Sequence, residues 1–234
     1  MKKLSIAVVA GLVTFSIGVV VALLWITRST PELANAKEPS NQCFPLSTQK
    51  VDSLKLGEEG YFPQAAFYGD QQPDLVVRSW YARYLAQMKE PSLLDSHTND
   101  NNGTYRFTWL RSFHSKVVVR VWTDAGGGML TVKELTREEE NRVAYMSVDQ
   151  TRRLTTDEWA EFVRLSNQVC LWRLSSTRGE AIATDGAWWV FEAHSAGYYQ
   201  IVARQAPETP YRELCIYMLK LSGLPLDASK GEIY

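Results

Sequence analysis

The sequence is poor in the residues that most often bind metals or carry out nucleophilic chemistry. It has three cysteines and three histidines in 234 residues. The cysteines form no C-x-x-C pair, and the histidines show no metal-ligand spacing. A G-x-S-x-G elbow is missing, and the glycine run at residues 126–128 links two expected strands, unlike a phosphate loop. The sequence therefore predicts no catalytic residue, no metal site and no cofactor.

A basic excess is also missing. The chain carries 25 basic and 26 acidic residues, and residues 37–234 carry 22 basic and 25 acidic ones. Binding to a phosphate backbone needs a basic excess or a basic patch. We therefore expect no nucleic-acid partner. One expected hairpin is locally basic, and we interpret it as a solvated edge or as a surface for an anionic partner; its basic residues are Arg106, Arg111, Lys116 and Arg120.

The N-terminal segment Leu4–Ile26 contains no charged residue and no proline. As a helix it would be about 34 Å long, enough to cross a hydrocarbon core of about 30 Å. Lys2 and Lys3 precede it, and only Arg28 follows closely. The positive-inside bias then places the N-terminus in the cytoplasm and the main domain in the periplasm or outside the cell. The expected protein is a single-pass membrane protein that contacts the lipid bilayer through residues 4–26.

A cleaved signal peptide is the rival interpretation, because residues 34–36 read Ala-Asn-Ala. The apolar run is longer than the usual signal-peptide core, which favours a retained anchor. Both interpretations export the same domain. The expected organisation is an anchor or uncleaved signal at 1–28, a proline-containing linker at 29–49 and an extracytoplasmic domain at 50–234.

The odd number of cysteines allows one disulfide outside the cytoplasm. Cys215 lies on an apolar helical stripe and is expected in the core. Cys43 and Cys170 flank expected elements, so we predict that they pair. The alternative is that all three cysteines are reduced and buried.

Apolar periodicity and turn signals predict three helices and six strands. The helices are expected at 71–89, at 155–168 behind a capping box formed by Thr155 and Glu158, and after Pro210. The strands are expected at 104–113, 116–123, 129–135 and 143–149, and as a hairpin within 185–207. Short connections favour an antiparallel meander. The expected fold is α+β: an antiparallel sheet of about six strands with helices mainly on one face, preceded by one N-terminal transmembrane helix.

The hairpin DGAWWVFEAHSAGYYQIVARQAP, Asp185–Pro207, concentrates large side chains. We predict a three-residue loop, Ser195–Gly197, because it puts the apolar residues of both strands on one face. That apolar face would pack under the helices; it consists of Trp189, Phe191, Ala193, Tyr199, Ile201 and Ala203. The other face would point away from the helices; it consists of Trp188, Val190, Glu192, His194, Tyr198, Gln200, Val202 and Arg204.

This second face is either a solvated sheet surface or a binding surface for a protein or envelope ligand. The candidate binding residues are Trp188, Glu192, His194, Tyr198 and Arg204. A hydrolase using Glu192 and His194 for proton transfer is the catalytic alternative. A structural envelope component is a further alternative.

Three runs of the sequence resemble a group of bacterial proteins with no assigned activity. They are TYRFTWLRSFHSKVVVRV, LTTDEWAEF and DGAWWVFEAHSAGYYQIVARQAPETPYRELC, within residues 72–224. The resemblance implies one bacterial domain of the cell envelope, and it transfers no functional residue.

Overall fold

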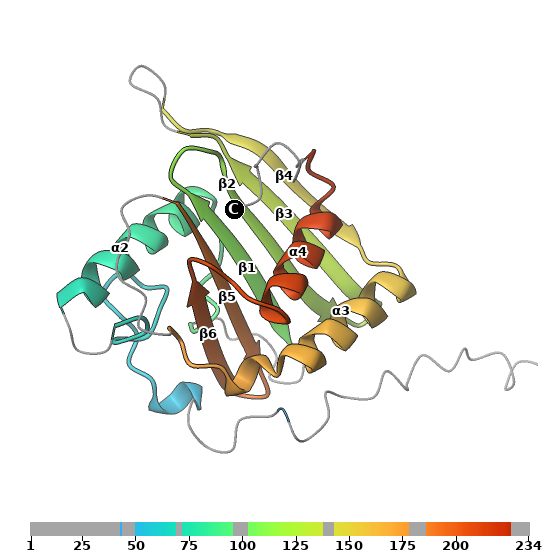
Figure 1. Ribbon diagram of the computed structural model, residues 1–234, viewed down its shortest axis with the longest axis horizontal. Coiled ribbons are helices and arrows are strands. Elements are labelled where there is room, and N and C mark those ends of the chain that lie inside the picture. Colours follow the sequence, from blue (N-terminus) through green and yellow to red (C-terminus); the bar gives the residue numbers. More distant parts are fainter. Residues whose placement is uncertain are drawn as a thin grey trace, which may run out of the picture. The chain divides into compact units, whose positions relative to one another are not determined.

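An antiparallel sheet of six strands, with helices on both faces, forms the centre of the fold (Figure 1). The computed structural model describes residues 43, 50–68, 72–95, 103–137, 143–177 and 186–225. These residues belong to one compact unit, Pro39–Tyr234. The α+β class, the antiparallel sheet and the three helices are as predicted.

The sheet combines a four-stranded meander with a hairpin. Its strands are β1 (Thr104–Arg111), β2 (Lys116–Asp124), β3 (Gly127–Leu135), β4 (Met146–Arg153), β5 (Ala187–Ser195) and β6 (Tyr198–Arg204). The order across the sheet is β4-β3-β2-β1-β5-β6. The meander is the predicted one, and the hairpin joins it by pairing β5 with β1. The first strand of the meander is therefore central in the sheet.

The three helices are α2 (Gln72–Gln87), α3 (Thr156–Val169) and α4 (Tyr211–Ser222), and short 3-10 turns lie at Val51–Ser53 and Leu171–Arg173. The predicted capping box is confirmed at the start of α3. The Thr155 hydroxyl accepts from the Glu158 amide at 3.2 Å, and the Glu158 carboxylate accepts from the Thr155 amide at 2.8 Å. Two of the free amides at the helix start are satisfied in this way.

Two apolar cores lie on opposite faces of the sheet. Helices α3 and α4 cover one face, where Phe162, Leu214 and Met218 pack with Trp109 and Trp189. Helix α2 covers the other face (Figure 1), and its side chains there include Val77, Tyr81 and Leu85. The expectation that helices lie mainly on one face thus missed the cover that α2 provides. Because both faces are covered, every residue of β5 before Ser195 is buried.

The hairpin between β5 and β6 corrects the predicted loop. Ser195 pairs with Tyr198, so only Ala196 and Gly197 form the turn. Both have positive φ, 51° and 75°, as a type I′ turn requires. The three-residue loop was wrong because alanine in the left-handed region leaves no signal in the sequence. The register shifts by one residue, and the side chains of β6 exchange faces relative to β5.

Among the described residues, no helix is both long and apolar enough to cross a membrane. The predicted transmembrane segment, residues 4–26, lies outside the described residues.

The turn provides a direct test of the hairpin register. Replacing Ala196 with Asn should stabilise the protein by about 1 kcal/mol, because Asn tolerates the left-handed conformation that costs alanine free energy. Thermal unfolding of the purified chain measures this gain, with Ala196→Val, a β-branched residue, as the destabilising control. A loss of stability in Ala196→Asn would favour the three-residue loop instead.

Candidate functional site

One row of polar side chains crosses the α2 face of the sheet. The strand register aligns Glu192 on β5 with Arg106 on β1, and Arg106 with Arg120 on β2. The row continues through Thr131 on β3 to Thr151 on β4. Residues directly opposite each other in antiparallel strands share a face. The sheet therefore gathers residues that are far apart in the sequence into a single polar track.

The innermost part of the track is a closed ion pair. Arg106 donates to Glu192 through Nε at 2.7 Å and through Nη2 at 2.8 Å. The Tyr199 hydroxyl donates to the same carboxylate at 2.8 Å, and Arg106 Nη1 donates to the Pro91 carbonyl at 2.6 Å. Arg106 and Glu192 have no exposed side-chain surface. The Arg106 guanidinium and the Glu192 carboxylate thus exchange their bonds to water for hydrogen bonds within the protein.

A second carboxylate, Glu90, joins the segment after α2 to the sheet. Its oxygens lie 2.9 Å from Arg120 Nε and 3.0 Å from Lys133 Nζ. Arg106 Nη1 is 3.7 Å away. Arg106 and Arg120 are direct neighbours on adjacent strands, where like charges repel. Glu90 offsets this repulsion.

Lys133 also binds the end of α2. Its ammonium group donates to the carbonyls of Met88 at 2.8 Å and Lys89 at 3.2 Å. A cation at this position satisfies carbonyls that the helix leaves free and interacts favourably with the helix dipole. The cluster of Glu90, Arg106, Arg120, Lys133 and Glu192, called the buried charge cluster below, therefore fixes α2 to the sheet.

The two carboxylates of the buried charge cluster differ in proton affinity. Burial alone would raise the pKa of Glu90, but the charges of Arg120, Arg106 and Lys133 outweigh it and lower the pKa below its usual value of 4.5. Burial raises the pKa of Glu192, and Arg106 counteracts only part of that effect. Burial also raises the pKa of Tyr199 well above its usual value, so its hydroxyl remains a donor.

This geometry suits Glu192 for holding strands and not for contacting a substrate. A general acid or base must come within hydrogen-bonding distance of the proton that it transfers. Both oxygens of Glu192 accept from Arg106, and one also accepts from Tyr199. His194, its expected partner, is buried with 4 % of its surface exposed.

The five candidate binding residues do not share a solvent-facing surface. Trp188, Glu192 and His194 are buried on the α2 face, whereas Tyr198 and Arg204 belong to the opposite side of the sheet. Tyr198 alone is half-buried. The expectation of one exposed face was wrong for two physical reasons: the hairpin register differs by one residue, and α2 covers the face.

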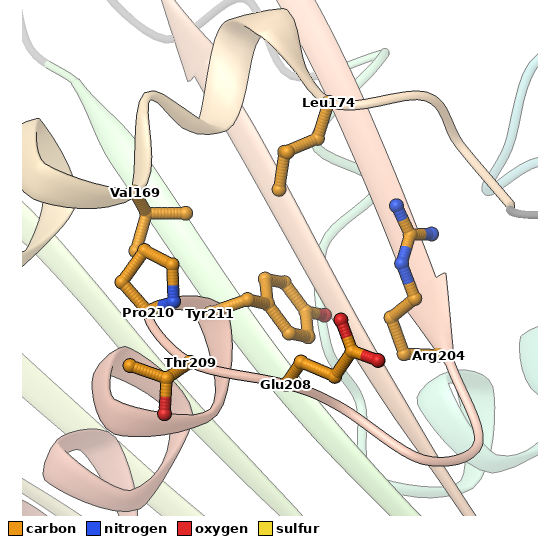
Figure 2. Close-up of a pocket in the computed structure, with 7 residues that line it drawn as sticks. All are labelled: Val169, Leu174, Arg204, Glu208, Thr209, Pro210 and Tyr211. Atoms are coloured by element: carbon orange, nitrogen blue, oxygen red, sulfur yellow. The ribbon is translucent and has the colours of Figure 1, made fainter.

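Arg204 lines a small pocket beside α4, together with Glu208 and Tyr211 (Figure 2). Its guanidinium donates to the carbonyls of Ser175 and Ser176, both at 2.9 Å. The Tyr211 hydroxyl lies 2.8 Å from the Trp189 carbonyl, to which it donates. The pocket volume is about 30 Å³, space for a water molecule but not for an organic substrate. We therefore interpret these contacts as structural.

Cys43 and Cys170 form a disulfide, which confirms the predicted pair. Their Cα atoms are 4.8 Å apart, and 127 positions separate them in the sequence. Cys170 ends α3 in a left-handed conformation. Cys215 is buried in the core, as expected. Within the described part of the chain, no group of three or more His, Cys, Asp or Glu side chains is arranged to hold a metal ion.

Comparisons of the chain with protein-family models, with curated proteins and with solved structures gave no match. The resemblance to a bacterial protein group therefore carries no further argument. The functional argument depends on the geometry alone.

Sequence reasoning missed the buried charge cluster. Arg106 and Arg120 alternate with apolar residues along their strands, which is also the pattern of a solvated sheet face. The informative signal is the position of Glu90, a charged residue directly after an apolar helical stripe and before Pro91. It becomes meaningful only once α2 is known to lie over these strands.

The ion pair predicts a non-additive mutational pattern. Glu192→Gln should destabilise the protein by about 3–5 kcal/mol, because it leaves Arg106 buried without its counter-charge. The double variant Arg106→Met with Glu192→Leu should lose much less than the sum of the two single variants. Urea unfolding measures this, with the exposed pair Arg164 and Glu161 as the control. Additive losses would contradict the coupling.

Glu90 predicts an acid-dependent loss of stability. Its pKa is lower in the folded protein than its usual value of 4.5, so its stabilising contribution is complete above that pH. The contribution is lost as the pH falls through the folded-state pKa. The stability difference between the natural chain and Glu90→Gln should therefore be largest near neutral pH and shrink on acidification. Unfolding midpoints measured from pH 7 to pH 3 test this, and a constant difference would contradict it.

Proposed function

We propose that the chain is a membrane-tethered module whose folded domain lies outside the cytoplasm and binds a partner in the cell envelope. The disulfide between Cys43 and Cys170 carries this proposal. Structural disulfides persist in oxidising compartments and are rare in the cytosol. Cys43 lies within the predicted linker, residues 29–49, so the bond ties the tether to the folded domain.

The apolar segment 4–26 supports the same placement, since its length matches a bilayer and its flanking charges put the domain outside. A disulfide from within the linker to the folded domain suits a tethered domain for a mechanical reason. Any pull on the anchor is passed through the bond to Cys170 at the end of α3, as well as along the chain after Cys43.

Binding is favoured over catalysis by the way the ionisable groups are used. Glu192, the residue that a hydrolase would need, is enclosed by Arg106 and Tyr199. The described surface instead exposes large apolar side chains at one end of the sheet, Phe113, Val143 and Tyr145. Exposed apolar residues of this size are frequent where proteins meet partners.

The redox state of the cysteines tests the placement. Cells are lysed in acid to trap thiols, and the full chain is alkylated before and after reduction. We expect Cys43 and Cys170 to react only after reduction. Cys43→Ser should expose a reactive Cys170 and destabilise the domain by about 4–5 kcal/mol, because the bond closes a loop of more than 100 residues.

Cys215→Ser is the matched control, because Cys215 is buried and outside the disulfide. It should leave the alkylation pattern of the other two cysteines unchanged. Alkylation of Cys43 and Cys170 without reductant, in a chain recovered from the cytosol, would overturn the proposed placement.

A further inference from the structure

The two edges of the sheet are finished differently. Along β6, the Ala203 amide donates to the Ser176 carbonyl at 2.7 Å, and Lys50 forms a bridge to Tyr198. Along β4, no described residue pairs with the outer side of the strand. Residues 149–153 of β4 are all exposed. An open strand edge is a template for another strand.

The direction of the free backbone groups follows from the pairing with β3. The Leu154 amide donates to the Gly128 carbonyl at 2.9 Å, which marks a hydrogen-bonded pair. In an antiparallel pair, hydrogen-bonded and non-hydrogen-bonded residues alternate along the strand. The amides and carbonyls of Arg152 and Gln150 therefore also point toward β3. The amides and carbonyls of Asp149, Thr151 and Arg153 point outward, and of these the Arg153 carbonyl accepts from Arg152 Nη1 at 3.0 Å. This row can bond to a strand laid beside it.

We propose that β4 pairs antiparallel with β4 of a second copy of the chain, which joins the two sheets into one. This proposal rests on the proposed tethering of the protein to a membrane. A two-fold axis perpendicular to the sheet keeps each face of one copy beside the same face of the other. Outward-facing residues of one strand then meet outward-facing residues of its partner.

Charge selects the register among the alternatives. A pairing centred on Asp149 places this carboxylate directly opposite Asp149 of the second copy. Like charges directly opposite each other are unfavourable. A pairing centred on Gln150 places Asp149 opposite Thr151. A pairing centred on Thr151 places Asp149 opposite Arg153 twice, once on each side of the axis. The β-bulge at the start of β4 disfavours centres nearer Met146.

Arg153 is available for such a pair. Its side chain is 55 % exposed, and its two bonds to Asp124 are 3.0 Å and 3.2 Å long. A guanidinium has five donors, so Asp149 of a second copy can share it. The Thr151 hydroxyl lies 2.9 Å from the Thr131 hydroxyl of its own chain, so it is bonded within the sheet.

Membrane tethering strengthens a contact of this size. A five-residue strand pair is small compared with a stable protein interface. Two copies confined to one membrane have a raised effective concentration, so a weak contact becomes populated. The disulfide fixes Cys43 to Cys170, which directly precedes the 3-10 turn Leu171–Arg173, and this turn contacts β6 at the other edge of the sheet.

A disulfide placed on the axis tests the pairing in the full chain in its native membrane. Opposite residues of a hydrogen-bonded pair have Cα atoms about 5.5 Å apart, within disulfide range. Thr151→Cys should therefore form a covalent dimer under mild oxidation. Ser147→Cys is the matched control on the same edge, because its two copies would lie roughly 26 Å apart. The Ser147→Cys chain should stay monomeric.

A charge exchange tests the register. Asp149→Arg in the Thr151→Cys chain should reduce the dimer yield at least several-fold. Adding Arg153→Asp should restore it, because both cross-strand pairs return with their signs exchanged. Equal crosslinking of Thr151→Cys and Ser147→Cys, no dimer from Thr151→Cys, or a covalent product with a different protein would each overturn the self-pairing.

A membrane-impermeant maleimide separates this proposal from the placement of the domain. Labelling of reduced Thr151→Cys in intact cells or spheroplasts, without dimer formation, overturns the pairing and leaves the extracytoplasmic placement standing. Dimer formation with a cysteine that is labelled only after the membrane is opened overturns the placement and leaves the pairing standing. We expect both labelling and dimer formation.

Discussion

The buried pair of Arg106 and Glu192 is the constraint on which the rest of the sheet depends. Two charges without solvent contact are tolerated only where every donor and acceptor finds a partner. This requirement fixes the register of β5 against β1, because a shift by one residue would turn Glu192 to the opposite face and remove the two hydrogen bonds that it accepts from Arg106. The main role of the pair is therefore to specify one alignment of β5 with β1, and its net contribution to the free energy of unfolding is secondary.

The same requirement explains why α2 is attached as it is. Charges on a sheet face need a cover that excludes water and also offers polar groups. The end of α2 supplies the Met88 and Lys89 carbonyls to Lys133, and Glu90 follows directly to neutralise Arg120. A purely apolar helix would leave these cations unpaired. The apolar stripe of α2 and the charge that follows it thus act together: one buries the sheet, and the other makes the burial of its cations tolerable.

Helices, the meander and the disulfide could be predicted because each has a local signal, such as the capping box at Thr155 or the elements beside Cys43 and Cys170. When both faces of a sheet are buried, the sequence gives no signal for which face a strand residue occupies. Alternating residues then point into two different cores, and no residue type marks the solvent side. Ala196 shows the same limit, because its left-handed conformation is imposed by the twist of the hairpin. In both cases, contacts between strands determine the conformation, and the local sequence pattern does not.

The polar track also connects the interior to the edge of the sheet. It begins at the enclosed Glu192 and ends at Thr151 on β4, the strand whose outer side pairs with no described residue. The ionisable groups of the track are already bound to one another, so they stabilise the sheet without offering chemistry to a ligand. Along the described part of β4, the outward-facing backbone groups of Asp149 and Thr151 retain bonding capacity for a strand laid beside them. A strand added at the edge of a sheet is recognised mainly through main-chain hydrogen bonds, and the proposed self-pairing of β4 uses this mode. In the proposed self-pairing of β4, the charges on the sheet face thus hold the interior together, and the recognition of the second copy takes place at the edge.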